Sequence, residues 1–339
     1  MPTEAGIMPE LRQNEATREW VIIATERAKR PEEFRSKEQK KPLPETKTDC
    51  VFCAGSENKT PAETFRIGGI GREWKVRTVL NKFAALSKSS GVVVSDSGIF
   101  RKMTGYGYHE VIVETPRHNA VTALLSESEV ADILRAYKNR YLFMEQDEEI
   151  DDIIIFKNHG SAAGTSLEHP HSQIVATPVV PHQVRNRIDI AITYYDDHHE
   201  CLYCKILRDE LKEGTRIIAE TEHFVCFTPF AALTPFHTWI YPKRHSSNYG
   251  RITDAELVDL SKILRLSLGK FYFGLNDPDF NYVIRSAPTD ARDASYFHWY
   301  LSLIPRLTKS AGFELGSGMF INVSIPEENA KFLREVVIS

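Results

Sequence analysis

Three stretches of the chain place apolar residues three or four positions apart, which is the spacing of an amphipathic helix. They are residues 126–141 (SESEVADILRAYKNRY), 183–197 (QVRNRIDIAITYYDD) and 253–271 (TDAELVDLSKILRLSLGKF). Each stretch therefore predicts one helix.

Segments in which apolar and polar residues alternate lie between these helices and are typical of strands. One alternating strand is expected to begin near Asn158 and another near Asn281, and a later strand in each region contains His169 or His298. A loop is expected at residues 88–98 (KSSGVVVSDSG), where serine and glycine gather without a period. Single helices among antiparallel strands predict an α+β fold.

The order of strings in the first part of the chain recurs in the second. FAAL occurs in both parts, YHEVIVETPRH closes on His118, and FHTWIYPKRH closes on His245. A further histidine follows each of these after a similar interval, since 169 − 118 = 51 and 298 − 245 = 53. Two diverged copies of one unit are therefore predicted, in residues 1–182 and 183–339.

Composition excludes some partners. The 339 residues carry a formal net charge of -4, so the chain lacks the basic field that binds a nucleic-acid backbone. No apolar run approaches the roughly 20 residues that span a bilayer, and the start lacks the regions of a signal peptide. We therefore expect a cytoplasmic protein with no nucleic-acid or membrane partner. Four of the five cysteines form two close pairs, CVFC and CLYC. In a reducing compartment such pairs indicate metal ligands or redox dithiols.

The cysteine pairs and the spaced histidines together supply the ligands that tetrahedral zinc prefers. The two predicted zinc sites are Cys50, Cys53, His118 and His169, and Cys201, Cys204, His245 and His298. Because four protein ligands leave no open position, both zinc ions should be structural. Two alternatives remain open: the cysteine pairs are redox dithiols, or His237 replaces His245 in the second site.

The segment SLEHPHSQIVATP, residues 166–178, holds His169 and His171 on either side of a proline. Residues two apart on a strand face the same side, so a metal-bound His169 would leave His171 beside a rigid anchor with a free ring. Such an imidazole can attack phosphorus and form a phosphoramidate. Gln173 faces the same side and can donate to a phosphate oxygen, as can backbone N–H groups of the loop NHGSAAGTSLE. The alternative is a zinc-bound or core histidine.

The second copy differs at these positions. Aligning the closing strands puts Tyr300 opposite His171 and Ser302 opposite Gln173. The second copy therefore keeps its metal set but lacks the free imidazole and the amide, and one nucleophile per chain is expected.

The residues around His171 resemble the active site of a known family. HPHSQ is similar to the HPHGQ string of the galactose-1-phosphate uridylyltransferases, which belong to the histidine-triad (HIT) superfamily. The likeness extends to LRQNEATREWVIIATERAKRP, CVFCAGSENKTPAETFRI, VLNKFAAL and FKNHGSAAGTSLE. It implies a duplicated HIT-like fold, in which two pseudo-symmetric motifs form one antiparallel-rich sheet with flanking helices. It also implies a homodimer whose active site borrows residues from the other subunit.

The resemblance assigns roles to individual residues. It makes His171 the residue that becomes nucleotidylated and Gln173 the group that stabilises the transferring phosphate. The substrate-binding residues that it implies are Gly164, Thr165 and Ser166 in the loop, Asn81 and Asn158 at the nucleoside monophosphate, and Arg27 and Arg30 near the diphosphate.

Departures from the family's pattern bear on the acceptor. The stretch RLTKSAGFELGSGMFIN has glycines, among them Gly312 and Gly316, around the places where the uridylyltransferases carry a lysine and acidic or amide residues for a hexose 1-phosphate. A glycine offers no side chain to a sugar hydroxyl, although its N–H can hold a phosphate. Ser172 also replaces the family's usual glycine. The pattern resembles the ADP-glucose phosphorylases, relatives in which orthophosphate takes the nucleotidyl group.

This resemblance predicts a two-step exchange, in which His171 takes the adenylyl group of ADP-glucose, glucose 1-phosphate leaves, and orthophosphate then releases ADP. Three alternatives stay open. The first is a UDP-glucose:hexose-1-phosphate uridylyltransferase, the second is a dinucleoside polyphosphate phosphorylase or hydrolase, and the third is a zinc-stapled nucleotide-binding module without turnover. The sequence does not decide between adenine and uracil.

Overall fold

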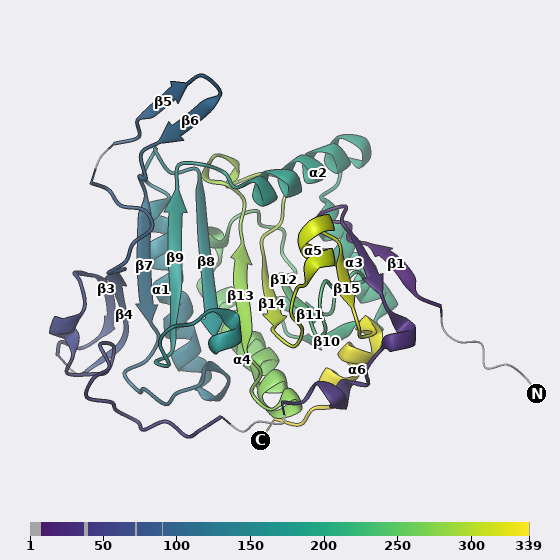
Figure 1. Ribbon diagram of the computed structural model, residues 1–339, viewed down its shortest axis with the longest axis horizontal. Coiled ribbons are helices and arrows are strands. Elements are labelled where there is room, and N and C mark those ends of the chain that lie inside the picture. Colours follow the sequence, from purple (N-terminus) through teal and green to yellow (C-terminus); the bar gives the residue numbers. More distant parts are fainter. Residues whose placement is uncertain (1–7, 37–39, 72, 90, 339) are drawn as a thin grey trace, which may run out of the picture.

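One large sheet organises the protein (Figure 1). The computed structural model describes residues 8–36, 40–71, 73–89 and 91–338. In these residues ten strands form the sheet in the order β10-β11-β12-β14-β13-β8-β9-β7-β4-β3, and every neighbouring pair is antiparallel. Residues 1–182, the N-terminal half, supply β3 (Glu63–Gly68), β4 (Trp74–Leu80), β7 (Tyr108–Val113), β8 (Asp152–His159) and β9 (His171–Thr177). Residues 183–339, the C-terminal half, supply β10 (Ile217–Glu220), β11 (Phe224–Phe227), β12 (Thr238–Pro242), β13 (Phe280–Arg285) and β14 (Tyr300–Pro305).

The two halves of the sheet meet at β8 and β13 and are related by a pseudo-two-fold axis. Ile155 of β8 pairs with Ile284 of β13. These positions are equivalent in the repeat, since 284 − 155 = 129 and 298 − 169 = 129. The pseudo-two-fold axis therefore passes between Ile155 and Ile284. The predicted α+β fold with one antiparallel-rich sheet is confirmed, while the boundary at residue 182 stays a prediction.

One long helix from each half packs on the same face of the sheet, behind it in Figure 1. These helices are α1 (Glu127–Met144) and α4 (Asp254–Leu275), and they also contact each other. Each begins at a capping box, in which the hydroxyl of Ser126 or Thr253 accepts a hydrogen bond from the N–H three residues further on. Together with α2 (His182–His198), they confirm the three predicted helices.

The prediction of a strand beginning near Asn158 is wrong. β8 spans Asp152–His159, so Asn158 lies near its end. The strand stops at Gly160, which has a φ of 83° and lies so close to Asp279 that a Cβ would come within 1.8 Å of its carboxylate. Only glycine fits this turn without strain.

The prediction of a loop at residues 88–98 is also wrong in part. This segment contains β5 (Val94–Ser97), which pairs with β6 (Phe100–Met103) in a hairpin. Consecutive valines favour extended chain, and Gly98 has a φ of 61° that suits the turn. The hairpin projects from the N-terminal half at the upper left of Figure 1.

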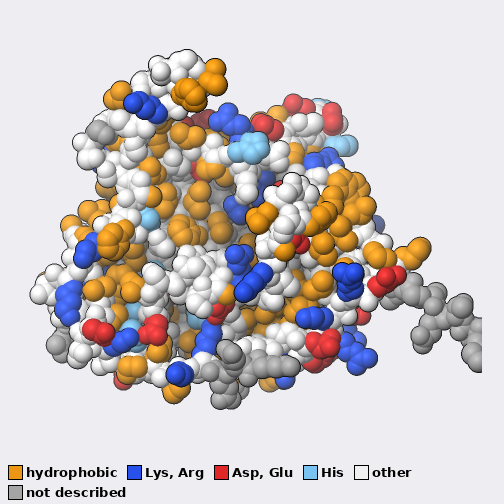
Figure 2. Space-filling view, viewed as in Figure 1, with side chains coloured by type: hydrophobic (Ala, Val, Ile, Leu, Met, Phe, Trp, Pro, Cys, Tyr) orange, Lys and Arg blue, Asp and Glu red, His pale blue; other side chains and the backbone are white. Residues whose placement is uncertain are grey.

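The second face of the sheet differs between the halves. Over the C-terminal half it is covered by β1 (Glu10–Gln13), β2 (Trp20–Ile23), β15 (Phe320–Asn322), α2 and α3 (Leu202–Glu213). The short helix α5 (Gly312–Ser317) contacts β15, and α6 (Pro326–Glu335) packs against β10. Over β7, β8 and β9, the described part of the chain places the short turn η5 (Ser161–Ala163) but no long helix (Figure 1). Figure 2 shows the molecule hollowed on this side. Among the described residues, no helix is long and apolar enough to cross a bilayer.

Candidate active site

His171 begins β9 and faces the open side of the sheet, because the next residue, Ser172, points to α1 on the other face. The His171 ring donates from Nδ1 to the carbonyl oxygen of His169 at 2.8 Å, so Nδ1 carries the hydrogen and Nε2 keeps its lone pair. Burial lowers the pKa of His171, which keeps the ring neutral. Phe52 packs against it with ring centroids 5.6 Å apart. The result is an oriented, uncharged imidazole whose Nε2 can act as a nucleophile.

A layer of buried polar residues lies directly beneath His171, between β9 and α1. The Lys157 ammonium contacts the Glu114 carboxylate at 2.6 Å and the carbonyl oxygen of His171 at 3.3 Å. Burial, the largest single influence, would raise the pKa of Glu114, but Lys157 and hydrogen bonds from two hydroxyl groups together hold the pKa below its usual value. Ser172 accepts a hydrogen bond of 2.7 Å from Tyr137. The serine that replaces the family's glycine is therefore part of the support for the nucleophile strand.

Gln173 lies on the open face, as predicted, and contacts one residue on the neighbouring strand β7 and one that directly follows β4. His109 Nε2 is 2.7 Å from Gln173 Oε1, and the Asn81 amide nitrogen is 3.4 Å from the same oxygen. His109 is a site residue that the sequence analysis missed. Its only sequence signal was the repeat itself, because YHEVIVE in the N-terminal half matches FHTWIYP, which contains His237, in the C-terminal half.

The loop that precedes β9 is tied to the junction between the halves. Asn281 donates from one amide nitrogen to Asn158 Oδ1 at 2.8 Å and to the carbonyl oxygen of Ala163 at 2.9 Å. Asp279 accepts from the N–H of Ala162 at 2.7 Å. Residues at the start of β13 and immediately before it thus hold the loop in place beside Asn158.

The structure divides the predicted loop residues between two positions. Gly164 ends η5 with a left-handed φ of 89°, which its lack of a side chain permits. Thr165 and Ser166 line a cavity of about 640 Å³ that also contacts Pro170, the residue before His171, although His171 itself does not line it. The loop therefore runs close to His171, with small side chains and exposed backbone near a space that a ligand can enter.

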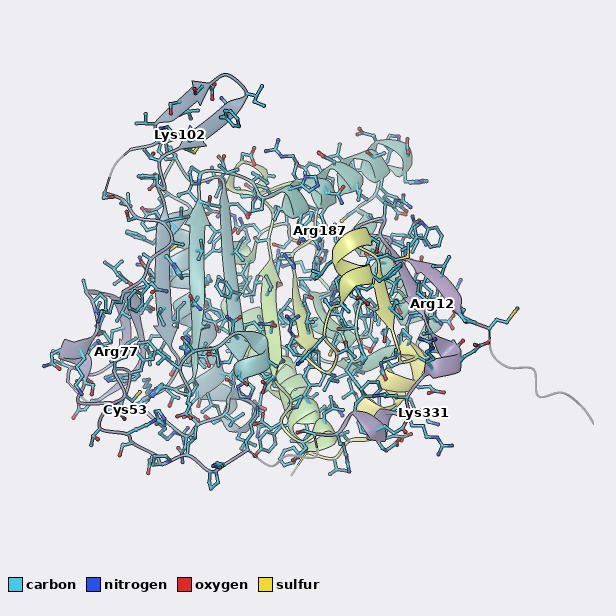
Figure 3. All side chains as sticks on the ribbon, in the orientation of Figure 1. Arg12, Cys53, Arg77, Lys102, Arg187 and Lys331 are labelled. Carbon is cyan, nitrogen blue, oxygen red and sulfur yellow. The ribbon has the colours of Figure 1, made fainter. Side chains whose placement is uncertain are left out.

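The four predicted ligands of the first metal site come together at the lower end of the N-terminal half, where Figure 3 labels Cys53. Cys50 Sγ is 3.6 Å from His169 Nδ1, and Cys53 Sγ is 3.6 Å from His118 Nδ1. Tetrahedral zinc would hold a sulfur and a nitrogen about 3.5 Å apart, given bonds of about 2.3 and 2.0 Å. The His169 Nε2 donates to the carbonyl oxygen of Thr115 at 2.8 Å, which leaves Nδ1 free for the metal. The cluster fits a zinc ion.

The second predicted set also comes together, with all four ligand atoms within 4.8 Å of one another. Cys204 Sγ lies 3.3 Å from Nδ1 of both His245 and His298. His237 is not part of this cluster, because its two ring nitrogens face the N–H of Leu233 and the hydroxyl of Ser302. His245, and not His237, therefore belongs to the cluster that could hold a metal ion. The two clusters differ in exposure, since the first is buried throughout whereas His245 and part of Cys204 are accessible.

The remaining predicted site residues lie apart from His171. Arg27 and Arg30 are exposed beside the short turns η1 (Thr25–Arg27) and η2 (Pro31–Phe34), next to β2. Gly312 and Gly316 lie on α5, with open space where a Cβ would stand. Within one chain, these four residues lie on the layer that covers the C-terminal half of the sheet, although Arg27 and Arg30 come from the N-terminal part of the sequence.

Comparison with known proteins agrees with this geometry. The family model described as galactose-1-phosphate uridyl transferase, N-terminal domain, matches residues 2–181, and the model of the C-terminal domain matches residues 187–334. The chain is 39% identical to ADP-glucose phosphorylase of Arabidopsis thaliana, over 98% of this chain and 94% of the relative. It is 31% identical to galactose-1-phosphate uridylyltransferase of Thermotoga maritima, over 98% of this chain and 99% of the relative.

Solved structures show the same relationship. A crystal structure of ADP-glucose phosphorylase from Arabidopsis thaliana with bound ADP-glucose has a TM-score of 0.82 and 36% identity, covering 98% of this chain and 99% of that chain. A structure of uridylyltransferase has a TM-score of 0.75 and 27% identity, covering 96% of this chain and 97% of that chain.

Proposed function

This chain belongs to the galactose-1-phosphate uridyl transferase family of nucleotidyltransferases, and from that premise we propose that it acts as an ADP-glucose phosphorylase. The reaction converts ADP-glucose and orthophosphate to ADP and glucose 1-phosphate. The observation that carries the proposal is the orientation of His171, whose Nε2 keeps its lone pair and faces the open side of the sheet. The choice of ADP-glucose as the substrate is supported by the relative named ADP-glucose phosphorylase, which is 39% identical to this chain.

The reaction has two displacements at the same phosphorus atom. His171 Nε2 attacks the α-phosphorus of ADP-glucose, the bond from that phosphorus to the bridging oxygen breaks, and glucose 1-phosphate leaves. An oxygen of orthophosphate then attacks the adenylyl-histidine, so that ADP leaves and the imidazole is regenerated. Two inversions give retention at phosphorus and ping-pong kinetics. The Gln173 amide would stabilise the charge on the transferring phosphate in both steps.

Substrate binding would use the groups that surround His171. Asn81 and Asn158 lie on either side of β9 and suit the nucleoside monophosphate, while Gly164, Thr165 and Ser166 offer backbone and hydroxyl donors to the phosphates. Phe83, two residues after Asn81, leaves 84% of its surface exposed and suits stacking on a base. The glycines of α5, Gly312 and Gly316, leave room for a small acceptor such as orthophosphate.

We assign one structural zinc ion to each Cys2His2 cluster, two per chain. The sulfur–nitrogen distances of 3.3 to 3.7 Å support this assignment. Neither ion carries a chemical step, because four protein ligands complete each coordination shell. Thiolate ligands persist in a reducing compartment, and we therefore propose that the protein works in the cytoplasm.

We further propose that the protein works as a homodimer. The hairpin β5–β6, which carries Lys102 in Figure 3, projects from the N-terminal half and leaves 93% of Ile99 and 75% of Phe100 exposed. A lone two-stranded hairpin with apolar side chains is stable only when something covers it. The exposed Arg27, Arg30, Gly312 and Gly316 would then serve the His171 of the partner subunit. Mixing two inactive variants, His171→Ala and Arg27→Ala, should restore part of the activity through mixed dimers, whereas no recovery would speak against shared sites.

The direct test of the chemistry is the intact mass of the protein after incubation with ADP-glucose, with peptide mapping of the adduct. We expect one adenylyl group on His171, discharged by orthophosphate to ADP, and no adduct on His171→Ala. A parallel incubation with UDP-glucose tests the main alternative. A uridylyl adduct discharged only by a hexose 1-phosphate would identify a uridylyltransferase instead, and the absence of any adduct would refute the nucleophile.

A further inference from the structure

We propose that His109 is a positioning residue that fixes the orientation of the Gln173 amide, so that its NH2 group faces the transferring phosphate. The role rests on the proposed function, because it concerns the same phosphate. His109 lies on β7 and Gln173 on β9, and the two side chains meet on the open face at 2.7 Å. His109 does not itself reach the reacting atoms. It would act through Gln173.

The protonation of His109 follows from a backbone contact. The N–H of Ala85 lies 3.1 Å from His109 Nδ1. A main-chain N–H is always a donor and cannot be reversed, so Nδ1 must accept and the hydrogen of the neutral ring must be on Nε2. His109 Nε2 then donates to Gln173, and the atom that receives it is the carbonyl oxygen Oε1. The direction of each bond is set by the main chain.

Asn81 strengthens the same orientation. Its Oδ1 accepts from the N–H of Phe83 at 2.9 Å, so its nitrogen points into the site as a donor. This nitrogen lies 2.9 Å from His109 Nε2, which already bears a hydrogen, and 3.4 Å from Gln173 Oε1. The acceptor for both donors is therefore Gln173 Oε1. With its oxygen held by two donors, the Gln173 amide must turn its own NH2 away, and the polarisation makes that NH2 a better donor.

The C-terminal half contains a histidine, His237, at the position equivalent to His109. Comparison of the two shows which contacts of His109 go beyond packing. Glu110 pairs with Ile174, and Thr238 pairs with Leu303 at the equivalent point of the repeat. The preceding residue is a histidine in both cases, and His237 also accepts from a backbone N–H, that of Leu233 at 3.4 Å. Its Nε2 contacts the Ser302 hydroxyl at 2.9 Å, where the N-terminal half has Gln173, and it also lies 3.1 Å from the indole N–H of Trp239, a donor that His109 does not have. Only the half with a nucleophile places an amide next to this histidine.

Two substitutions distinguish the role of His109 Nδ1 as an acceptor from the role of His109 Nε2 as a donor. In His109→Asn the amide oxygen can replace Nδ1 as the acceptor for Ala85, but the short hydrogen bond to Gln173 is lost and only the longer one from Asn81 remains. In His109→Gln the amide nitrogen can replace Nε2 as the donor. We expect His109→Asn to slow the single-turnover labelling of His171 by about tenfold with little change in nucleotide-sugar affinity, and His109→Gln to recover most of the rate.

The decisive comparison repeats His109→Asn in a Gln173→Ala background. If His109 acts through Gln173, the second change should alter the labelling rate by less than about twofold. A full tenfold loss in both backgrounds, or no loss in either, would overturn the proposal. His237→Asn is the matched control, because it removes the equivalent ring from the other half and should affect stability but not the labelling rate of folded protein.

A measurement on the unmodified enzyme covers the case in which the variants do not fold. The nitrogen-15 resonances of histidine side chains distinguish the two neutral tautomers, and through-bond correlation to the assigned backbone identifies the His109 signal without any variant. We expect His109 to carry its hydrogen on Nε2, and the opposite tautomer would refute the proposal. Labelling of His171 in the unmodified enzyme tests the proposed function separately. If UDP-glucose rather than ADP-glucose labels His171, the rate measurements on the His109 variants are made with UDP-glucose. No label from either would refute the proposed function, whereas the tautomer still tests the orientation of Gln173.

Discussion

The two halves of the sheet share their strand order, their long helix and their Cys2His2 cluster, yet only one of them leaves a face open. In the N-terminal half this face carries His171. In the C-terminal half the equivalent position, 171 + 129 = 300, is Tyr300, which is 2% exposed against 9% for His171. Its ring packs 4.9 Å from Tyr241 and 5.2 Å from Trp239, under α2 and α3. The metal cluster and the fold are therefore compatible with a reactive site but do not create one. The difference lies in a few side chains and in what covers them.

The layer beneath the strand differs in the same way. Ser172 contacts the buried polar groups of Tyr137 and Glu114, and Glu114 in turn pairs with Lys157. The equivalent residue of the C-terminal half, 172 + 129 = 301, is Leu301 within the apolar core. Buried polar networks cost desolvation and are retained where they fix a geometry. In this protein such a network lies directly behind the nucleophile.

The largest difference in turnover should be between substitutions of the two equivalent strand residues, His171 and Tyr300. His171→Ala should lower turnover by more than about 10⁴-fold, because it removes the atom that forms the covalent bond. Tyr300→Phe should keep nearly full turnover, since the ring still fills its pocket. Phosphate-dependent release of ADP from ADP-glucose measures both variants. Substantial turnover by His171→Ala would remove the basis of the comparison.

Metal removal should distinguish the two clusters by their exposure. Part of the C-terminal cluster is accessible, whereas Cys50 and Cys53 are 8% and 3% exposed. A graded chelator treatment should therefore remove one zinc ion per chain first, and labelling of His171 should persist at that stage. Loss of the second ion should abolish labelling, because His169 both binds the metal and holds His171 Nδ1. Metal analysis alongside labelling checks this order, and Cys204→Ser should mimic the first stage.

The sequence predicted the parts of the site that depend on local spacing or on the repeat. The metal ligands were found because cysteines and histidines recur at matched intervals, and His171 because it lies two residues from a ligand. Contacts between distant strands could not be predicted. His109 and Gln173 are separated by 64 positions and meet only through the register of β7 and β9. The same holds for Glu114 and Lys157, whose pairing needs a buried face that alternation alone does not show.

The buried ion pair behind the nucleophile should have the next largest effect. Glu114→Gln leaves the Lys157 ammonium buried without a counter-charge, which should cost about 3–5 kcal/mol of unfolding free energy. The double variant Glu114→Gln/Lys157→Met should recover much of this stability, since it removes both charges. Arg135→Ala is the control, because its pair with Asp132 lies at the surface and should contribute under about 1 kcal/mol. Urea unfolding measures all three, and equal costs for the buried and surface pairs would contradict the expected role of burial.

The smallest effect should come from Ser172, which separates support for the strand from chemistry. Ser172→Ala removes one hydrogen bond from Tyr137, whose hydroxyl still contacts Tyr282 at 2.5 Å, so the cost should be about 1 kcal/mol. Ser172→Gly restores the glycine usual in the uridylyltransferases and should cost somewhat more, because glycine is unfavourable within a strand. Neither change touches the open face, so the labelling rate of His171 should fall by less than about threefold. A much larger loss of rate at this small cost in stability would mean that the polar layer tunes the nucleophile itself, and the difference between the halves would then extend below the strand.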